Sequence, residues 1–310
     1  MKKIIILFIF FISVNVLAVA QSTNENHATI DSIYQELLVG NSFHVEYSTL
    51  LNETIKKYNE TDLLEQLEKY KKQDGNNIKH LLFNVWNAIF YKTEEMVLKQ
   101  AMLENITSFC LLKYQYGRIT HHLFLQKIPS VYYNDKAKKN IQDALEKYQH
   151  SELMLLAATL ETDGLADFLK DFFKKQNPPS YKTAWDTQYW QARLAFARLG
   201  DKESIDFYME KFKNYDVQRP GFSNISAKMG YMRQPETIEL LKELLMSDKN
   251  LKPKYFRNGH GVAFYALYQL TQGIEDFPIP YENKGPFYTL EELEIARNWA
   301  KNDMPYKIRK

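Results

Sequence analysis

Pairs of neighbouring acidic residues are the groups in this sequence whose spacing could support catalysis. Such local pairs include Glu161 with Asp163, Asp167 with Asp171, and Glu292 with Glu294. Two carboxyl groups flanking a sugar linkage are the machinery of most glycoside hydrolases. Aromatic residues that could stack on sugar rings occur nearby: Tyr181, Trp185, Tyr189 and Trp190. Each acid pair, however, falls at a helix start or on a polar helix face, where solvent and the helix dipole stabilise carboxylates. For each of these acid pairs a structural role is therefore favoured over a catalytic one.

The sequence supports a metal site or a catalytic nucleophile even less than it supports catalysis by paired carboxylates. The adjacent His121 and His122 would point about 100° apart on a helix and could not share one metal ion. Cys110 is the single cysteine and lies in an apolar stretch, which is typical of a buried residue. No G-x-S-x-G, P-loop or G-x-G-x-x-G motif occurs. We therefore expect no metal, no cofactor and no enzyme activity, although a catalytic group assembled from distant residues would leave no such motif.

The first twenty residues have the three parts of a secretory signal peptide. Lys2 and Lys3 precede an apolar run over residues 4–12, and Ala18 and Ala20 form a small-residue cleavage site. A membrane anchor needs about 20 largely apolar residues, and Ser13 interrupts this run early. We predict a signal peptide over residues 1–20, cleavage after Ala20 and a secreted or periplasmic product. No integral membrane segment is expected after cleavage.

The charge balance argues against nucleic acid as a partner. The chain carries 40 Lys and Arg residues and 38 Asp and Glu residues. Residues 1–20 hold two lysines and no acid, so removing two from 40 leaves 38 basic residues against 38 acidic ones. Proteins that bind nucleic acid normally present an excess of positive charge to the phosphates. The mature chain is formally neutral, and we expect no nucleic-acid partner.

Apolar residues recur at helical spacing through the second half of the chain. One run at i, i+3, i+4, i+7 and i+8 consists of Leu165, Phe168, Leu169, Phe172 and Phe173. Residues 205–212 and 238–245 repeat the pattern. Each run predicts a helix with one apolar stripe that a neighbour must cover. Asp201, Pro235 and the Thr289–Glu292 pair are helix-start signals at the expected places.

These helices form a series of similar units. Helix–turn–helix patterns cover residues 156–173, 194–212 and 227–245, and a degenerate fourth begins at residue 266. The residues flanking the turns are spaced by 39, 33 and 38 positions: Leu160, Leu199, Met232 and Leu270. Paired helices with periods of 33 to 40 residues are typical of an α-solenoid. The alternative, a tetratricopeptide array, would have a fixed period of about 34 residues, and the uneven spacing counts against it.

The segment A-R-L-G-D-K-E-S-I at residues 197–205 resembles the turn of a HEAT repeat. Residues 266–271, followed by Asp276-Phe277 and a helix containing Trp299, are similar to the last repeat of many bacterial HEAT proteins, although the family glycine is displaced to Gly273. The resemblance covers about residues 151–303 and implies an all-α, armadillo-like solenoid of stacked antiparallel helix pairs with a terminal capping helix. We interpret residues 21–150 as irregular N-terminal helical repeats, with a separate helical domain as the alternative, and 304–310 as a tail.

The function expected from this architecture is that of an exported, non-catalytic scaffold with a protein or peptide partner. By resemblance to HEAT proteins, the second helix of each pair would contribute an exposed row to the concave face. That row comprises Lys170, Asp171, Asp206, Glu210, Glu239, Lys242 and Glu243. The alternatives are an all-helical enzyme acting on glycans or cell-envelope material, with the aromatic cluster lining a cleft, and a regulatory or assembly part. Nothing in the sequence predicts the oligomeric state.

Overall fold

A computed structural model describes the second half of the chain almost continuously and the first half in part. The described residues are 65, 67–68, 70–72, 76–113, 125–126, 128–176, 188–217, 221–248, 261–281, 286–302 and 305–309. The predicted signal peptide, His121, His122, Tyr181 and Trp185 lie outside them, as does the side chain of Cys110. The described part is almost entirely helical, which confirms the all-α class.

The chain divides into two compact units. One comprises residues 1–118 with 131–144, and the other residues 119–130 with 145–310. The sequence suggested a boundary at residue 150, whereas the structure divides the chain within the helix α7 (Asp135–Tyr148).

The first unit consists of helices that pack on one another and bury a tryptophan. Helix α4 (Asn76–Lys92) packs on α5 (Met96–Asn105) and on the π-helical turn η1 (Ile106–Lys113) that continues it. A short 3₁₀ helix, η2 (Ser130–Tyr132), precedes α7. Trp86 is 1% exposed and meets the edge of Phe109 with ring centroids 5.6 Å apart. An ion pair of 2.8 Å between Lys136 and Glu104 joins α7 to α5.

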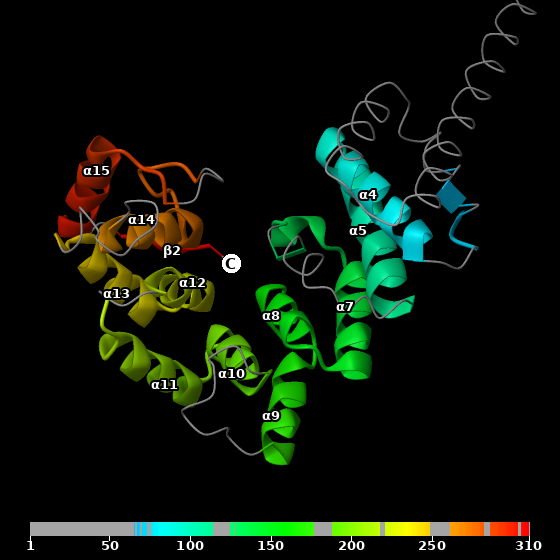
Figure 1. Ribbon diagram of the computed structural model, residues 1–310, viewed down its shortest axis with the longest axis horizontal. Helices are drawn as coiled ribbons and strands as arrows, with labels where there is room; N and C mark the ends of the chain where they lie inside the picture. Colours follow the sequence, from blue (N-terminus) through cyan, green and yellow to red (C-terminus); the bar gives the residue numbers. More distant parts are fainter. Residues whose placement is uncertain are drawn as a thin grey trace, which may run out of the picture. The chain divides into compact units, whose positions relative to one another are not determined.

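The second unit contains four helix hairpins in succession (Figure 1). Their helices are α8 (Ser151–Thr159) and α9 (Leu165–Lys175), α10 (Gln188–Arg198) and α11 (Lys202–Lys213), α12 (Phe222–Met232) and α13 (Pro235–Leu245), and α14 (Val262–Gly273) and α15 (Leu290–Lys301). We call α8, α10, α12 and α14, the first helix of each hairpin, the first helices. They form a row in which α10 packs on α8 and α12, and α12 packs on α14. In Figure 1 the second helices α9, α11, α13 and α15 lie on the outer side of this row.

Local sequence signals explain where these helices begin. The Asp201 carboxylate accepts a hydrogen bond of 2.9 Å from the backbone N–H of Ser204 at the start of α11. Pro235 is the first residue of α13, where its missing N–H breaks no helical hydrogen bond. Thr289 and Glu292 form the predicted capping box of α15, with bonds of 3.1 and 2.6 Å. All three predicted helix starts are confirmed.

The apolar stripes provide the core of the second unit. Ile205, Tyr208 and Phe212 of α11 are buried, and so are Ile238, Leu241 and Leu245 of α13. They belong to one continuous cluster that extends from Leu194 to Ala296. Burying a large aliphatic or aromatic side chain contributes about 1.5–3 kcal/mol. The periodic residues predicted to face a neighbouring helix therefore do so in these two helices.

The C-terminal residues take part in the fold. Strand β1 (Ile274–Glu275), which follows α14 directly, pairs antiparallel with β2 (Lys307–Ile308). The backbone N–H of Arg309 also donates to the carbonyl of Gly273 over 2.8 Å. Residues 305–309, which the sequence pattern suggested as part of a tail, thus supply partners for carbonyl groups at the end of α14. Among the described helices, none combines the length and hydropathy that crossing a membrane requires.

A glycine sets the distance between α12 and α14. A Cβ atom on Gly230 would lie 2.1 Å from Oε1 and 2.9 Å from Cβ of Gln269. We expect Gly230→Ala to lower the free energy of unfolding by about 1–2 kcal/mol, because overpacking outweighs the better helix propensity of alanine. Urea unfolding of this variant, with Ser223→Ala on the exposed face of α12 as a control, measures the effect. The additional change Gln269→Ala should recover part of the loss. A Gly230→Ala variant as stable as the parent would show that the helices are not this close.

Candidate binding site

Three residues of the predicted row are exposed and already engaged in local ion pairs. On α9, Lys170 pairs with Asp167 at 3.2 Å, and Asp171 pairs with Lys174 at 2.9 Å. On α11, Asp206 pairs with Lys202. The hydrogen bond from Lys174 and its charge lower the pKa of the Asp171 carboxyl group. Exposed pairs of this kind contribute little to stability, so a partner could replace them at small cost.

Two glutamates of the row have no competing contact. Glu210 on α11 and Glu243 on α13 are exposed. Within the part of the chain that the structure describes, neither carboxylate makes a hydrogen bond or an ion pair. These two side chains are therefore the members of the row most available to a positively charged partner.

Lys242 does not belong to an exposed row. Its side chain is buried, with the residue 8% exposed, and its ammonium group lies 5.7 Å from the ring centroid of Trp299 and 5.5 Å from that of Tyr306. Glu239 accepts a hydrogen bond of 2.8 Å from the Tyr306 hydroxyl and lies 3.2 Å from the ammonium group. The prediction that Lys242 is exposed was wrong, because its aliphatic stem and its charge meet two aromatic faces supplied by distant residues.

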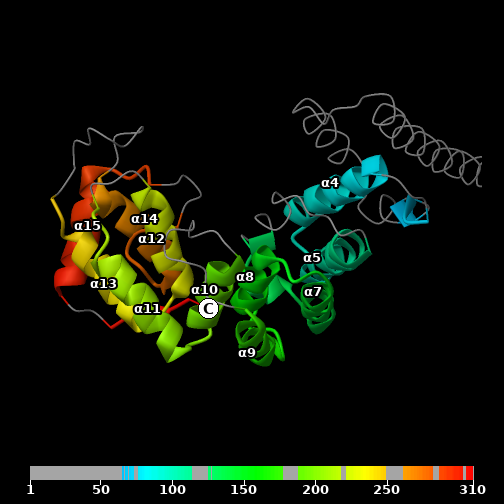
Figure 2. The same ribbon diagram turned by 60° about the horizontal axis from the view of Figure 1, so that its bottom comes forward.

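The side on which the row lies also differs from the expectation. The resemblance implied that the second helices line a concave face. Figures 1 and 2 instead show α11 and α13 on the outer side of the row formed by the first helices. Between successive hairpins the first helices pack on one another, and α13 also packs on both α14 and α15.

Of the residues considered for glycan chemistry, the structure describes Trp190 and the acid pairs but not Tyr181 or Trp185. Trp190 is 6% exposed and stacks on Phe207, with ring centroids 4.9 Å apart and an angle of 7° between the planes. It is a core residue, so it cannot offer its face to a sugar. Glu161 and Asp163 are exposed in the turn after α8. No group of three potential metal ligands occurs among the described residues.

A partly buried tyrosine links two hairpins that are not adjacent in the chain. The hydroxyl of Tyr231 on α12 donates to the carbonyl of Leu155 on α8 over 2.6 Å. The guanidinium of Arg198, at the end of α10, lies 5.0 Å from the centroid of the Tyr231 ring and donates to the Tyr231 carbonyl. Three first helices therefore meet at one tyrosine.

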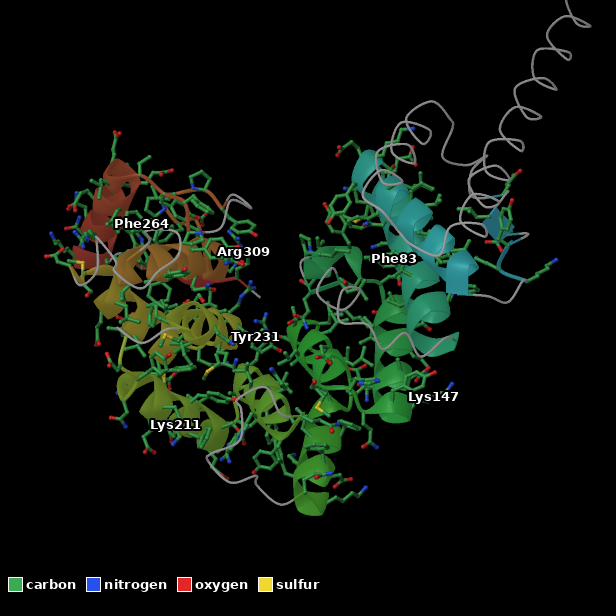
Figure 3. The ribbon with its side chains drawn as sticks, viewed as in Figure 1. Phe83, Lys147, Lys211, Tyr231, Phe264 and Arg309 are labelled. Atoms are coloured by element: carbon green, nitrogen blue, oxygen red, sulfur yellow. The ribbon has the colours of Figure 1, made fainter. Side chains whose placement is uncertain are left out.

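Two further arginines complete what we call the arginine cluster, defined as Arg198, Arg233 and Arg309. Arg233 follows α12 with a φ of 49°, and its Nη1 donates to the Arg309 carbonyl over 2.7 Å. Arg309 in turn donates through Nη2 to the carbonyl of Ile274 over 3.1 Å. Figure 3 shows Tyr231 and Arg309 on the same side of the second unit. The sequence did not predict this cluster.

Burial shifts the pKa values of Arg198, Arg233 and Tyr231. Burial, followed by the charges of Arg198 and Arg309, lowers the pKa of Arg233 to about 10. Burial raises the pKa of Tyr231 to about 12, against the opposing influence of Arg198. At neutral pH all three guanidinium groups are charged and the phenol is neutral. Glu161 is the acid whose charge acts on Arg198.

The chain matches no family model, no curated protein and no solved structure in the comparisons made with known proteins.

The Tyr231 hydroxyl offers a direct test of this geometry. We expect Tyr231→Phe to lower the free energy of unfolding by about 1 kcal/mol at neutral pH, the net contribution of one hydrogen bond. The neutral phenol favours the folded state fully below pH 10, and this contribution is lost as the pH rises towards 12. The parent protein should therefore lose more stability between these pH values than the variant. Urea titrations across this range measure the difference, with Tyr189→Phe as a control. Parallel curves of stability against pH for the parent and Tyr231→Phe would contradict the raised pKa of Tyr231.

Proposed function

We propose that this chain is an exported, non-catalytic scaffold that binds a protein or peptide partner through the surface of a helical-repeat solenoid. One observation carries the proposal: four helix hairpins follow each other in the chain, and successive first helices pack on one another from α8 to α14. A protein built in this way presents similar side chains at regular intervals on a rigid surface, and an extended partner can contact several intervals at once.

The register of acidic residues supports a positively charged partner. Asp206 and Glu210 are exposed on α11, and Glu239 and Glu243 are exposed on α13. The second pair follows the first by 33 residues, which is the spacing of Leu199 and Met232 at the corresponding turns. Equivalent places on successive hairpins thus carry four carboxylates. We infer that a segment rich in lysine or arginine crosses α11 and α13, with Glu210 and Glu243 as its free contacts.

Export is the second part of the proposal. The basic, apolar and small-residue parts of residues 1–20 support a cleaved signal peptide. Export through a secretory channel would deliver the chain to the periplasm or the medium, where the partner must also occur. Within the described residues, no observation favours the glycan enzyme over this scaffold, because Trp190 is buried.

Charge reversal at the two free glutamates tests the proposed surface. We expect the variant Glu210→Lys/Glu243→Lys to lose most of the proteins that the parent captures from an envelope extract of its own organism, because like charges would face the partner. Quantitative mass spectrometry of the captured proteins measures the loss. The control Glu94→Lys/Asp163→Lys makes the same change in net charge at exposed positions elsewhere and should capture the parental set. Capture that is identical for the parent and both variants would exclude this surface.

Processing of the N-terminus tests export. When the full chain is expressed in a bacterial host, we expect the recovered protein to begin at Gln21, as intact-mass measurement and N-terminal sequencing would show. Ala20→Arg should block cleavage because the peptidase requires a small residue there, whereas Val19→Arg, between the two small positions, should be processed. Uncleaved parent protein in the membrane fraction would favour an anchor over a signal peptide.

A further inference from the structure

We propose that the arginine cluster is a binding site for a compact oxyanion with at least two negative charges, of which inorganic phosphate is the simplest. The inference does not depend on the proposed scaffold function. It rests on how the three guanidinium groups are held, on what they lack and on which of their N–H groups remain open.

Backbone carbonyl groups hold the three guanidinium groups in place. Nη1 of Arg198 donates to the Tyr231 carbonyl, and Nη1 of Arg233 donates to the Arg309 carbonyl over 2.7 Å. Arg309 donates to the Ile274 carbonyl over 3.1 Å. These bonds fix the guanidinium planes before any ligand arrives, which reduces the entropy that binding would remove.

The cluster lacks the acidic partners that other arginines have. Arg193 pairs with Glu203, and Arg297 lies 2.9 Å from both Glu294 and Asp248. None of the three cluster arginines forms an ion pair with a carboxylate anywhere in the described residues. Three charges are therefore brought together with no counter-charge in contact, and the lowered pKa of Arg233 reflects this repulsion together with burial.

Open N–H groups remain for a ligand. Arg198 and Arg233 each make a single guanidinium hydrogen bond, through Nη1, which leaves Nε and Nη2 of both without a protein acceptor. These nitrogens are not among the buried polar atoms without a partner, in contrast to Nε of Arg193. All three arginines of the cluster are partly exposed, so the cluster lies in contact with solvent.

An oxyanion matches both the charge and the geometry of this arrangement. Guanidinium groups present paired N–H donors that fit the oxygen atoms of phosphate or carboxylate. Three positive charges favour a multiply charged ligand over a single carboxylate. The structural alternative is that the arginines only cap carbonyl groups at the ends of α12 and α14. Capping engages both Nη1 and Nη2 of Arg309 but only Nη1 of Arg198 and Arg233, and it predicts no ligand.

Nuclear magnetic resonance of the purified, ¹⁵N-labelled protein separates the two explanations. Inorganic phosphate is added at millimolar concentrations while chloride keeps the ionic strength constant. We expect saturable shifts of the Nε–H signals of Arg198, Arg233 and Arg309, and none for Arg193 or Arg297. Absence of saturable shifts, or equal shifts of all five signals, would overturn the proposal. Sulfate should produce the same pattern and acetate a much weaker one. If acetate binds as well as phosphate, the requirement for a double charge is wrong.

Variants test the assignment to these residues. Arg233→Gln should weaken phosphate binding about tenfold or more, as expected for loss of a charge-assisted hydrogen bond. Arg233→Lys, which keeps the charge without the paired donors, should fall between it and the parent. Lys213→Gln removes one exposed charge elsewhere and should bind like the parent. Equal affinity of Arg233→Gln and the parent would refute the site. If circular dichroism shows that Arg233→Gln is unfolded, the titration of the parent protein decides alone.

Discussion

The burial of each hairpin's apolar stripe against the next hairpin is the interaction on which the second unit depends. None of these short amphipathic helices would be stable alone in water. Ile205 and Phe212 of α11 and Ile238 and Leu241 of α13 join one cluster that reaches α15. That packing places the ends of the first helices near each other, and only then can Arg198, Tyr231 and Arg233 meet. The exposed acids of α11 and α13 owe their common register to the same packing.

The helices were predictable because their signals are local. Apolar spacing, the Asp201 cap and the Thr289–Glu292 capping box all lie within a few residues of the elements they define. The burial of Lys242 and the pairing of β1 with β2 were not predictable, because Trp299, Tyr306 and residues 307–308 come from far along the chain. The likeness to HEAT repeats remains an expectation, since no family model matches.

The candidate site also has a part that could be predicted from local sequence and a part that depends on distant residues. The sequence identifies most of the exposed positions of α11 and α13 from the polar residues beside the apolar stripe: Glu210 and Glu243 are exposed, whereas Lys242 is buried. It does not identify the side of the unit on which they lie, which depends on which helices pack between hairpins. The arginine cluster left one faint signal, an arginine at the end of two successive first helices, 35 residues apart. The place of Arg309 in the cluster and the hydrogen bond from Tyr231 to Leu155 could be found only from the structure.

In an ideal chain of stacked units, each unit feels only its immediate neighbours, and a terminal unit can fray without disturbing the rest. The hydrogen bond from Tyr231 to Leu155 breaks that rule, because it joins α12 to α8 across the intervening hairpin. Opening of the α8–α9 hairpin therefore removes a contact from its second neighbour as well as from its first. Such next-nearest-neighbour coupling raises cooperativity, so the three hairpins from α8 to α13 should melt as one block and not one after another.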